Sequence, residues 1–158
     1  ALKELDQFKG YKFATERSQH LMSLGIPLNT DSTLKGQTVF LAERCGELMH
    51  DNIITDRTIL DVMAFTMNAK SIPYQDKEAF ETYASEFIRE YDHIFYISPH
   101  GLEIEDNGIR ETDEHYRDLI DFTITTLIKR HGHKAGKINK LSGSTEERIL
   151  QILHFLQS

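Results

Sequence analysis

Residues 52–68 carry the sequence NIITDRTILDVMAFTMN, in which a short apolar run ends on an acid and an arginine and then passes into a helical pattern. An apolar run of this length, closed by Asp56, is typical of a strand buried in a parallel sheet. The segment from about Thr58 to Asn68 is expected to be a helix. A strand that passes directly into a helix indicates an α/β fold.

The same alternation recurs along the chain. Further strands are expected near residues 11–15, 93–98 and 137–141, so that a parallel sheet with helices on both faces forms one domain over residues 1–158. The helices expected around these strands cover residues 1–8, 17–24, from 30–32 to about 51, 76–91, 113–130 and from 144 onward. For the helix that ends near Asp51, the predicted buried face consists of Val39, Leu41, Ala42, Cys45, Leu48 and Met49.

Composition narrows the class of protein. With 39% hydrophobic and 27% charged residues, the 158-residue chain has the composition of a globular domain. A net charge of -7 argues against binding to long nucleic acids. The single cysteine, Cys45, excludes an internal disulfide, and no apolar run is long enough to cross a membrane. We therefore expect a soluble cytoplasmic protein; a homodimer is left open.

Acid–arginine pairs follow two of the expected strands. Glu16-Arg17 follows the first and Asp56-Arg57 the second, and ligands collect at the carboxyl ends of strands in such sheets. Phosphoryl transfer needs carboxylates for the acceptor hydroxyl or the magnesium shell, and cations that offset phosphate charge. The pairs predict a phosphoryl-transfer site. The alternative is that each pair is an ordinary surface ion pair beside a helix.

A polar segment at residues 100–117 is a candidate lid. Arg110 and Arg117 lie seven residues apart, so they would share one face if both were helical. Such a segment could close over phosphates. The alternatives are a solvated loop and, much less well supported, a calcium-binding loop, since Glu103 stands where the calcium-loop template has Asp.

Taken in order, these motifs resemble a known family. A strand ending in Thr-Glu-Arg, the Asp-Arg-Thr strand quoted above, a strand ending in Ser-Pro, a Gly-Ile-Arg lid and a final Ser-Gly-Ser-Thr-Glu-Glu-Arg segment occur in sequence. This order resembles the P-loop kinases of the AAA type that include nicotinamide riboside kinase domains and, more distantly, deoxynucleoside kinases. The resemblance covers nearly the whole chain and implies a three-layer sandwich that binds ATP and Mg²⁺.

The resemblance also implies roles for particular residues. Glu16 would lie near the acceptor hydroxyl, Asp56 would act on magnesium or the acceptor, and Arg57 would bind phosphate. The lid arginines, Arg110 and Arg117, would offset charge on the transferred phosphoryl group. The remaining implied contacts are with the nucleotide base and would come from Gly143 and Ser144.

One part of the family pattern is missing. Members begin with a strand and a Gly-rich Lys-Ser/Thr loop, and nothing in the 158 residues matches this loop. The segment from Gly132 to Lys137 has three residues between its glycines instead of four, and Ile138 follows the lysine. In the resembled fold the missing strand lies between the strands at 52–56 and 93–98. We therefore expect these two strands not to pair, and about 15–25 further residues before Ala1.

The function predicted from the sequence is transfer of the γ-phosphoryl group of ATP to a small nucleoside-like or nucleotide acceptor. Two alternatives stay open at this point. One is a non-catalytic nucleotide-binding regulator with the same fold, and the other is a degenerate P-loop domain that serves only in protein association.

Overall fold

The four expected strands are all present in the computed structural model, which describes residues 1–15, 18–100 and 113–157. They form two parallel pairs: β1 (Lys12–Ala14) with β2 (Ile53–Thr55), and β3 (His93–Ile97) with β4 (Lys137–Leu141). The predicted parallel α/β fold is confirmed. The described strands make two two-stranded sheets, however, and not one continuous sheet.

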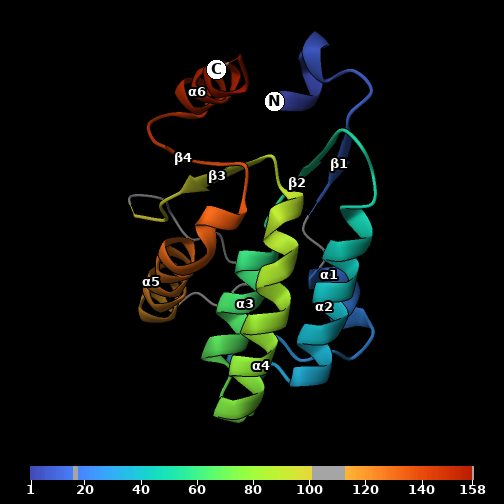
Figure 1. Ribbon diagram of the computed structural model, residues 1–158, viewed down its shortest axis with the longest axis vertical. Coiled ribbons are helices and arrows are strands. Elements are labelled where there is room, and N and C mark those ends of the chain that lie inside the picture. Colours follow the sequence, from blue (N-terminus) through green and yellow to red (C-terminus); the bar gives the residue numbers. More distant parts are fainter. Residues whose placement is uncertain (16–17, 101–112, 158) are drawn as a thin grey trace.

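Helices lie on both sides of the strands. In the view of Figure 1, α1 to α5 lie below the strands, whereas α6 and the N-terminal residues lie above them. Among the described residues, none of these helices combines the length and apolar character needed to cross a membrane. Their bounds are α1 Ser18–Ser23, α2 Leu34–Glu47, α3 Ile59–Asn68, α4 Tyr74–Ala84, α5 Glu114–His131 and α6 Thr145–Gln157.

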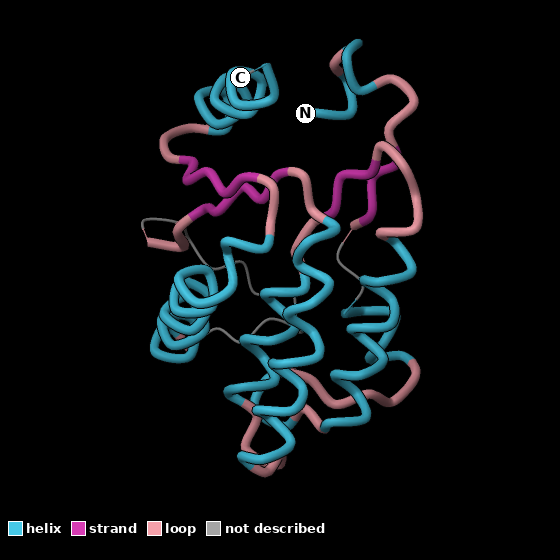
Figure 2. Tube along the Cα trace, viewed as in Figure 1, coloured by secondary structure: helices cyan, strands magenta, loops and turns pink. Residues whose placement is uncertain are grey.

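The inner strands β2 and β3 are not hydrogen-bonded neighbours, as predicted. Figure 2 shows the two pairs side by side with a space between them. In a parallel ladder, successive residues direct their backbone groups to opposite sides. Asp56 N–H donates to the Ala14 carbonyl, and Lys137 N–H donates to the Asp92 carbonyl. Residues 53 and 55 of β2 and residues 93, 95 and 97 of β3 therefore direct their N–H and C=O groups away from their partner strands.

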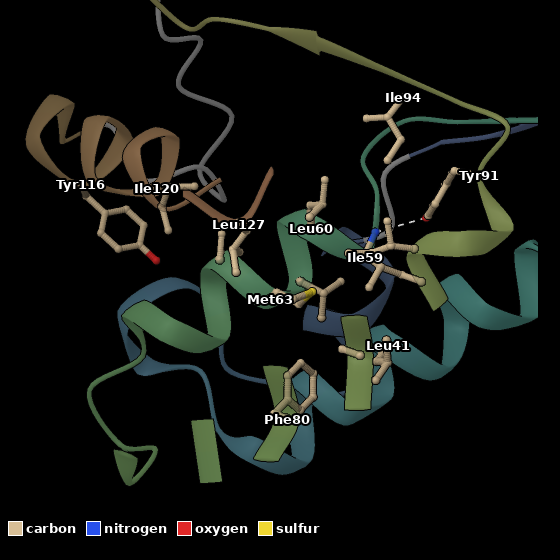
Figure 3. Close-up of a cluster of buried hydrophobic side chains, with 14 residues drawn as sticks. Leu41, Ile59, Leu60, Met63, Phe80, Tyr91, Ile94, Tyr116, Ile120 and Leu127 are labelled. Atoms are coloured by element: carbon tan, nitrogen blue, oxygen red, sulfur yellow. Dashed lines mark hydrogen bonds between the residues drawn. The ribbon is translucent and has the colours of Figure 1, made fainter. Parts of the chain in front are cut away.

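The core is built around α3. Ile59, Leu60 and Met63 are at most 1% exposed, and α3 packs against α2, α4 and α5 (Figure 3). The helix α3 begins with a capping box, in which Thr58 Oγ1 accepts from Leu60 N–H and Asp61 Oδ2 accepts from Thr58 N–H. This cap satisfies backbone donors that the first turn leaves without intrahelical partners, so it fixes where the chain leaves β2.

The prediction for α2 needs correction. The helix begins after Thr33 and ends at Glu47. Two residues predicted on its buried face, Ala42 and Met49, are exposed, Met49 to 84%. The buried face includes Arg44 and Glu47, which the apolar pattern did not include. The N-cap is Thr33 and not one of the residues at 30–32, because Thr33 Oγ1 accepts from Gly36 N–H at 3.1 Å.

Two other predicted helices are shorter or tighter than expected. The helix expected to continue to Tyr91 ends as an α-helix at Ala84 and continues as a 3₁₀-helix over Ser85–Glu90. Tyr83, in the last turn of the α-helix, is exposed. The first eight residues form two 3₁₀ turns, Leu2–Glu4 and Asp6–Phe8. The helix expected over 113–130 is confirmed as α5, with Tyr116, Ile120 and Leu127 buried on its inner face.

A partly buried ion-pair cluster joins α4 to the end of α5. Glu81 Oε1 accepts from Arg130 Nη1 at 2.5 Å and lies 2.7 Å from His131 Nε2. Burial would raise the pKa of Glu81, but the hydrogen bonds from His131 and Arg130 outweigh it, and the net shift is downward. A depressed pKa means that the ionised form stabilises the fold above the ordinary value near 4.5, and that this stability is lost as the pH falls.

We therefore predict that Glu81→Gln lowers the free energy of unfolding at neutral pH by about 1.5–3 kcal/mol. The difference from the parent should shrink as the pH falls from 4.5 through the lower folded-state pKa of Glu81, because the carboxylate of the folded parent becomes protonated over that range. Urea denaturation across this pH range measures both effects. A deficit that stays constant into acid would contradict the assignment.

Candidate functional site

A groove of about 1250 Å³ separates the two strand pairs. It is lined along its length by β2 and β3, at one end by the residues that lead into α3, and on one side by a face of α5. Ile152 and Leu156 of α6 and Phe8 reach it from the other side. The backbone groups of β2 and β3 that have no partner strand lie along this groove, so it is both a cavity and a pair of strand edges.

The turn after β2 places the predicted acid–arginine pair in the groove. Asp56 and Arg57 both line it, directly before the cap of α3. Arg57 has a φ of 75°, a left-handed conformation that a side chain with a Cβ adopts at a cost. Its guanidinium carbon lies 5.5 Å from the centre of the Phe65 ring. Strained backbone of this kind is concentrated at functional sites.

A second polar group faces the groove from α5. Arg117 and Asp121 are one helical turn apart on this helix, and both line the groove. Tyr96 of β3 donates its hydroxyl hydrogen to Asp121 Oδ1 at 2.5 Å. The Asp121 side chain is 13% exposed, and its Oδ2 lies 3.8 Å from His100 Nε2. Arg117 was predicted from the sequence, whereas Tyr96 and Asp121 were not, although the four-residue spacing between Arg117 and Asp121 was a usable signal.

The Tyr96 phenol has a pKa raised to about 12, first because it is buried and then because it donates to the Asp121 carboxylate. A raised folded-state pKa means that the protonated phenol stabilises the fold below the ordinary value of 10, and that this contribution is lost between pH 10 and about 12. We predict that Tyr96→Phe flattens the loss of stability over this range, as measured by denaturation at successive alkaline pH values. An unchanged slope in the variant would contradict it.

The residues predicted to contact the base occupy the turn before α6. Gly143 has a φ of 87°, and a Cβ at this position would collide with the Glu147 carboxylate. Ser144 and Glu147 form a capping box, with Ser144 N–H donating to Glu147 Oε2 at 2.6 Å and Glu147 N–H donating to Ser144 Oγ at 3.2 Å. Neither Gly143 nor Ser144 is among the described residues that line the groove.

The structure thus brings three of the predicted site residues to one groove: Asp56, Arg57 and Arg117. Glu16 and Arg110 lie outside the described residues, as does most of the candidate lid. Asp56 and Gly143 each follow the carboxyl end of a strand, as expected. In the described part of the chain, however, only Asp56 lines the groove.

The donors in the groove suit part of a nucleotide site. Mg²⁺ bound with a nucleotide commonly takes one or two protein carboxylates and completes its shell with phosphates and water, and Asp56 can supply such a carboxylate. No group of three or more histidine, cysteine or acidic side chains that could hold a metal occurs within the described residues. Arg57 and Arg117 offer planar, permanently charged partners for phosphate oxygens. A backbone cradle for the phosphates is not supplied by these residues.

Comparisons with known proteins agree with this architecture. The family model described as "AAA domain" matches residues 1–148, from the N-terminal turns to the first turn of α6. No curated protein and no solved structure matches the chain.

Proposed function

Because this chain belongs to the AAA domain family, a family of nucleotide-binding P-loop proteins, we propose that it is an ATP-dependent phosphotransferase acting on a nucleoside-like or nucleotide acceptor. The observation that supports this proposal best is the convergence of Asp56, Arg57 and Arg117 on one groove, in which Asp56 and Arg57 directly follow the carboxyl end of the parallel strand β2. This is where ligands bind in open α/β sheets.

Each residue has a proposed role. Asp56 orients the acceptor hydroxyl and accepts its proton, or completes the coordination of Mg²⁺. Arg57 and Arg117 bind phosphate oxygens, and Arg110 and Glu16 join them as a lid arginine and a second acid near the acceptor. Gly143 and Ser144 contact the base. When bound, Mg²⁺ and ATP supply the transferred phosphoryl group and part of the charge compensation.

The groove itself is proposed to take one further parallel strand. Such a strand would pair with the free edges of both β2 and β3, so that the strand order would become β1, β2, the added strand, β3 and β4. Adjacent strands lie about 4.8 Å apart, so a strand inserted between two others holds them about 9.6 Å from each other. The loop after it would carry the Lys-Ser/Thr phosphate cradle that the 158 residues lack.

A transfer assay on the full-length natural protein tests this function. The protein is incubated with Mg²⁺, γ-labelled ATP and a panel of nicotinamide riboside, ribonucleosides, deoxynucleosides and nucleoside monophosphates. We expect one class of acceptor to gain the label, and chelation of Mg²⁺ to abolish the transfer. Stabilisation by ATP without any labelled acceptor would favour the non-catalytic regulator. Absence of both responses would contradict nucleotide binding.

A further inference from the structure

Arg44 and Glu47 form a buried ion pair within α2. The two residues are 4% and 8% exposed, and Arg44 Nη1 lies 2.8 Å from Glu47 Oε2. In many proteins the free energy lost by desolvating both charges exceeds the free energy gained from their mutual attraction. A buried ion pair is therefore weak evidence for a role in stability. A buried arginine in this position therefore requires an explanation beyond its partner on the same helix.

The same nitrogen of Arg44 makes a second contact. Nη1 also donates to the backbone carbonyl of Asp56 at 3.2 Å. This contact joins α2 to the carboxyl end of β2, twelve residues further along the chain, where Asp56 lines the groove. One guanidinium nitrogen carries two hydrogens, so it can satisfy the Glu47 carboxylate and the Asp56 carbonyl together.

The Asp56 carbonyl lies where the backbone passes from strand β2 into a left-handed turn. Asp56 N–H still belongs to the sheet, since it donates to Ala14 O at 2.8 Å, and the next residue, Arg57, is left-handed. Two residues beyond, Ile59 N–H donates to the buried hydroxyl of Tyr91 at 3.2 Å. Hydrogen bonds therefore fix the turn on both sides of the left-handed residue Arg57. On the side of Asp56, the charged donor is Arg44.

We propose that Arg44 is a positioning residue, which holds the Asp56–Arg57 turn in the geometry used for phosphoryl transfer. The proposal rests on the proposed function. Displacements of about 1 Å at a reacting group can cost about 100-fold in rate, so the loss of one anchoring hydrogen bond is sufficient to be measured. Glu47 is the counter-ion that offsets the charge of Arg44 in the core.

The rival explanation is that the pair contributes to stability alone, and two variants of the full-length protein separate these roles. Arg44→Met/Glu47→Met removes both charges, so no unpaired charge is left in the core and stability should stay near that of the parent. The Asp56 carbonyl nevertheless loses its donor, and kcat should fall about 10- to 100-fold with a smaller change in the KM for ATP. Glu47→Gln should show the opposite pattern, with lower stability and a kcat close to that of the parent.

Controls make the outcomes distinguishable. Glu81→Gln destabilises the protein at a site away from the groove, so it shows what a general loss of stability does to kcat. The carbonyl carbon-13 chemical shift of Asp56 in the double variant reports the lost hydrogen bond without reference to activity and should move upfield. If the parent transfers no phosphate, the proposed function fails, whereas the shift still tests the anchoring. A double variant with the parent's kcat or with an unchanged Asp56 shift would overturn the proposal.

Discussion

Replacing Asp56 with Asn in the full-length protein is expected to lower kcat by about 10²- to 10⁴-fold, the range for losing a group that transfers a proton in the transition state. The amide keeps the size of the carboxylate but neither accepts a proton nor coordinates Mg²⁺ well. Because Asp56 is exposed, the free energy of unfolding should change by less than about 0.5 kcal/mol. Steady-state kinetics and thermal denaturation of the same preparation measure both quantities.

Asp51→Asn is the matched control for this experiment. Asp51 is also exposed and also lines the groove, but it precedes β2 and so lies at the amino end of that strand. The same loss of one negative charge at this end should leave kcat close to that of the parent. Equal rates for the Asp56 variant and the parent would remove Asp56 from the mechanism, and equal losses in both variants would indicate a general effect of charge.

Replacing Arg57 with Gly is expected to lower kcat by about 10³-fold, at the low end of the range for arginines that offset transition-state charge in phosphoryl transfer. The effect on the free energy of unfolding should depend on which residue replaces Arg57. Arg57→Gly and Arg57→Ala both lose the contact with Phe65, but glycine adopts the φ of 75° without the cost that a Cβ brings. The glycine variant should therefore be more stable than the alanine variant by about 1 kcal/mol.

Arg57→Gly and Arg57→Ala separate the cost of the left-handed backbone from the role of the guanidinium in transfer. Both should be nearly inactive, although one tolerates the turn and the other does not. If the glycine variant kept most of the activity, the guanidinium would have no part in transfer, and if alanine were as stable as glycine, the left-handed turn would not exist in solution.

Much of the fold could be predicted from local pattern. The strands at 53–55 and 93–97 are short apolar runs bounded by acids or by Ser-Pro, and Thr58 with Asp61 marks a helix start, so each signal lies within a few residues. The buried face of α2 could not be predicted in this way. Hydrophobic periodicity assigns charged residues to the surface, whereas Arg44 is buried because its partners, Glu47 and the Asp56 carbonyl, are brought together by tertiary structure.

The candidate site shows the same division. Asp56, Arg57 and Arg117 were found because strand ends and lid arginines are sequence features. Tyr96 and Asp121 were not found, since their hydrogen bond joins a strand to a helix 25 residues away and neither residue type is distinctive by itself. The groove between β2 and β3 was anticipated only through the family resemblance, which supplied a strand order that local pattern does not contain.

A strand inserted in the groove between the strand pairs would bring the proposed phosphate-binding loop beside Asp56. Amide hydrogen exchange of the full-length protein, followed by NMR, tests it residue by residue. The amides that the ladder geometry directs into the groove are those of Ile53, Thr55, His93, Phe95 and Ile97. Their internal controls are the amides directed to β1 and β4, which belong to Ile54, Ile94 and Tyr96.

If a further parallel strand occupies the groove, both sets of amides should exchange slowly and with similar protection, because each is hydrogen-bonded within one continuous sheet. Slow exchange in the control set together with rapid exchange in the groove-facing set would show that the edges of β2 and β3 are open to solvent, and would contradict the proposed inserted strand.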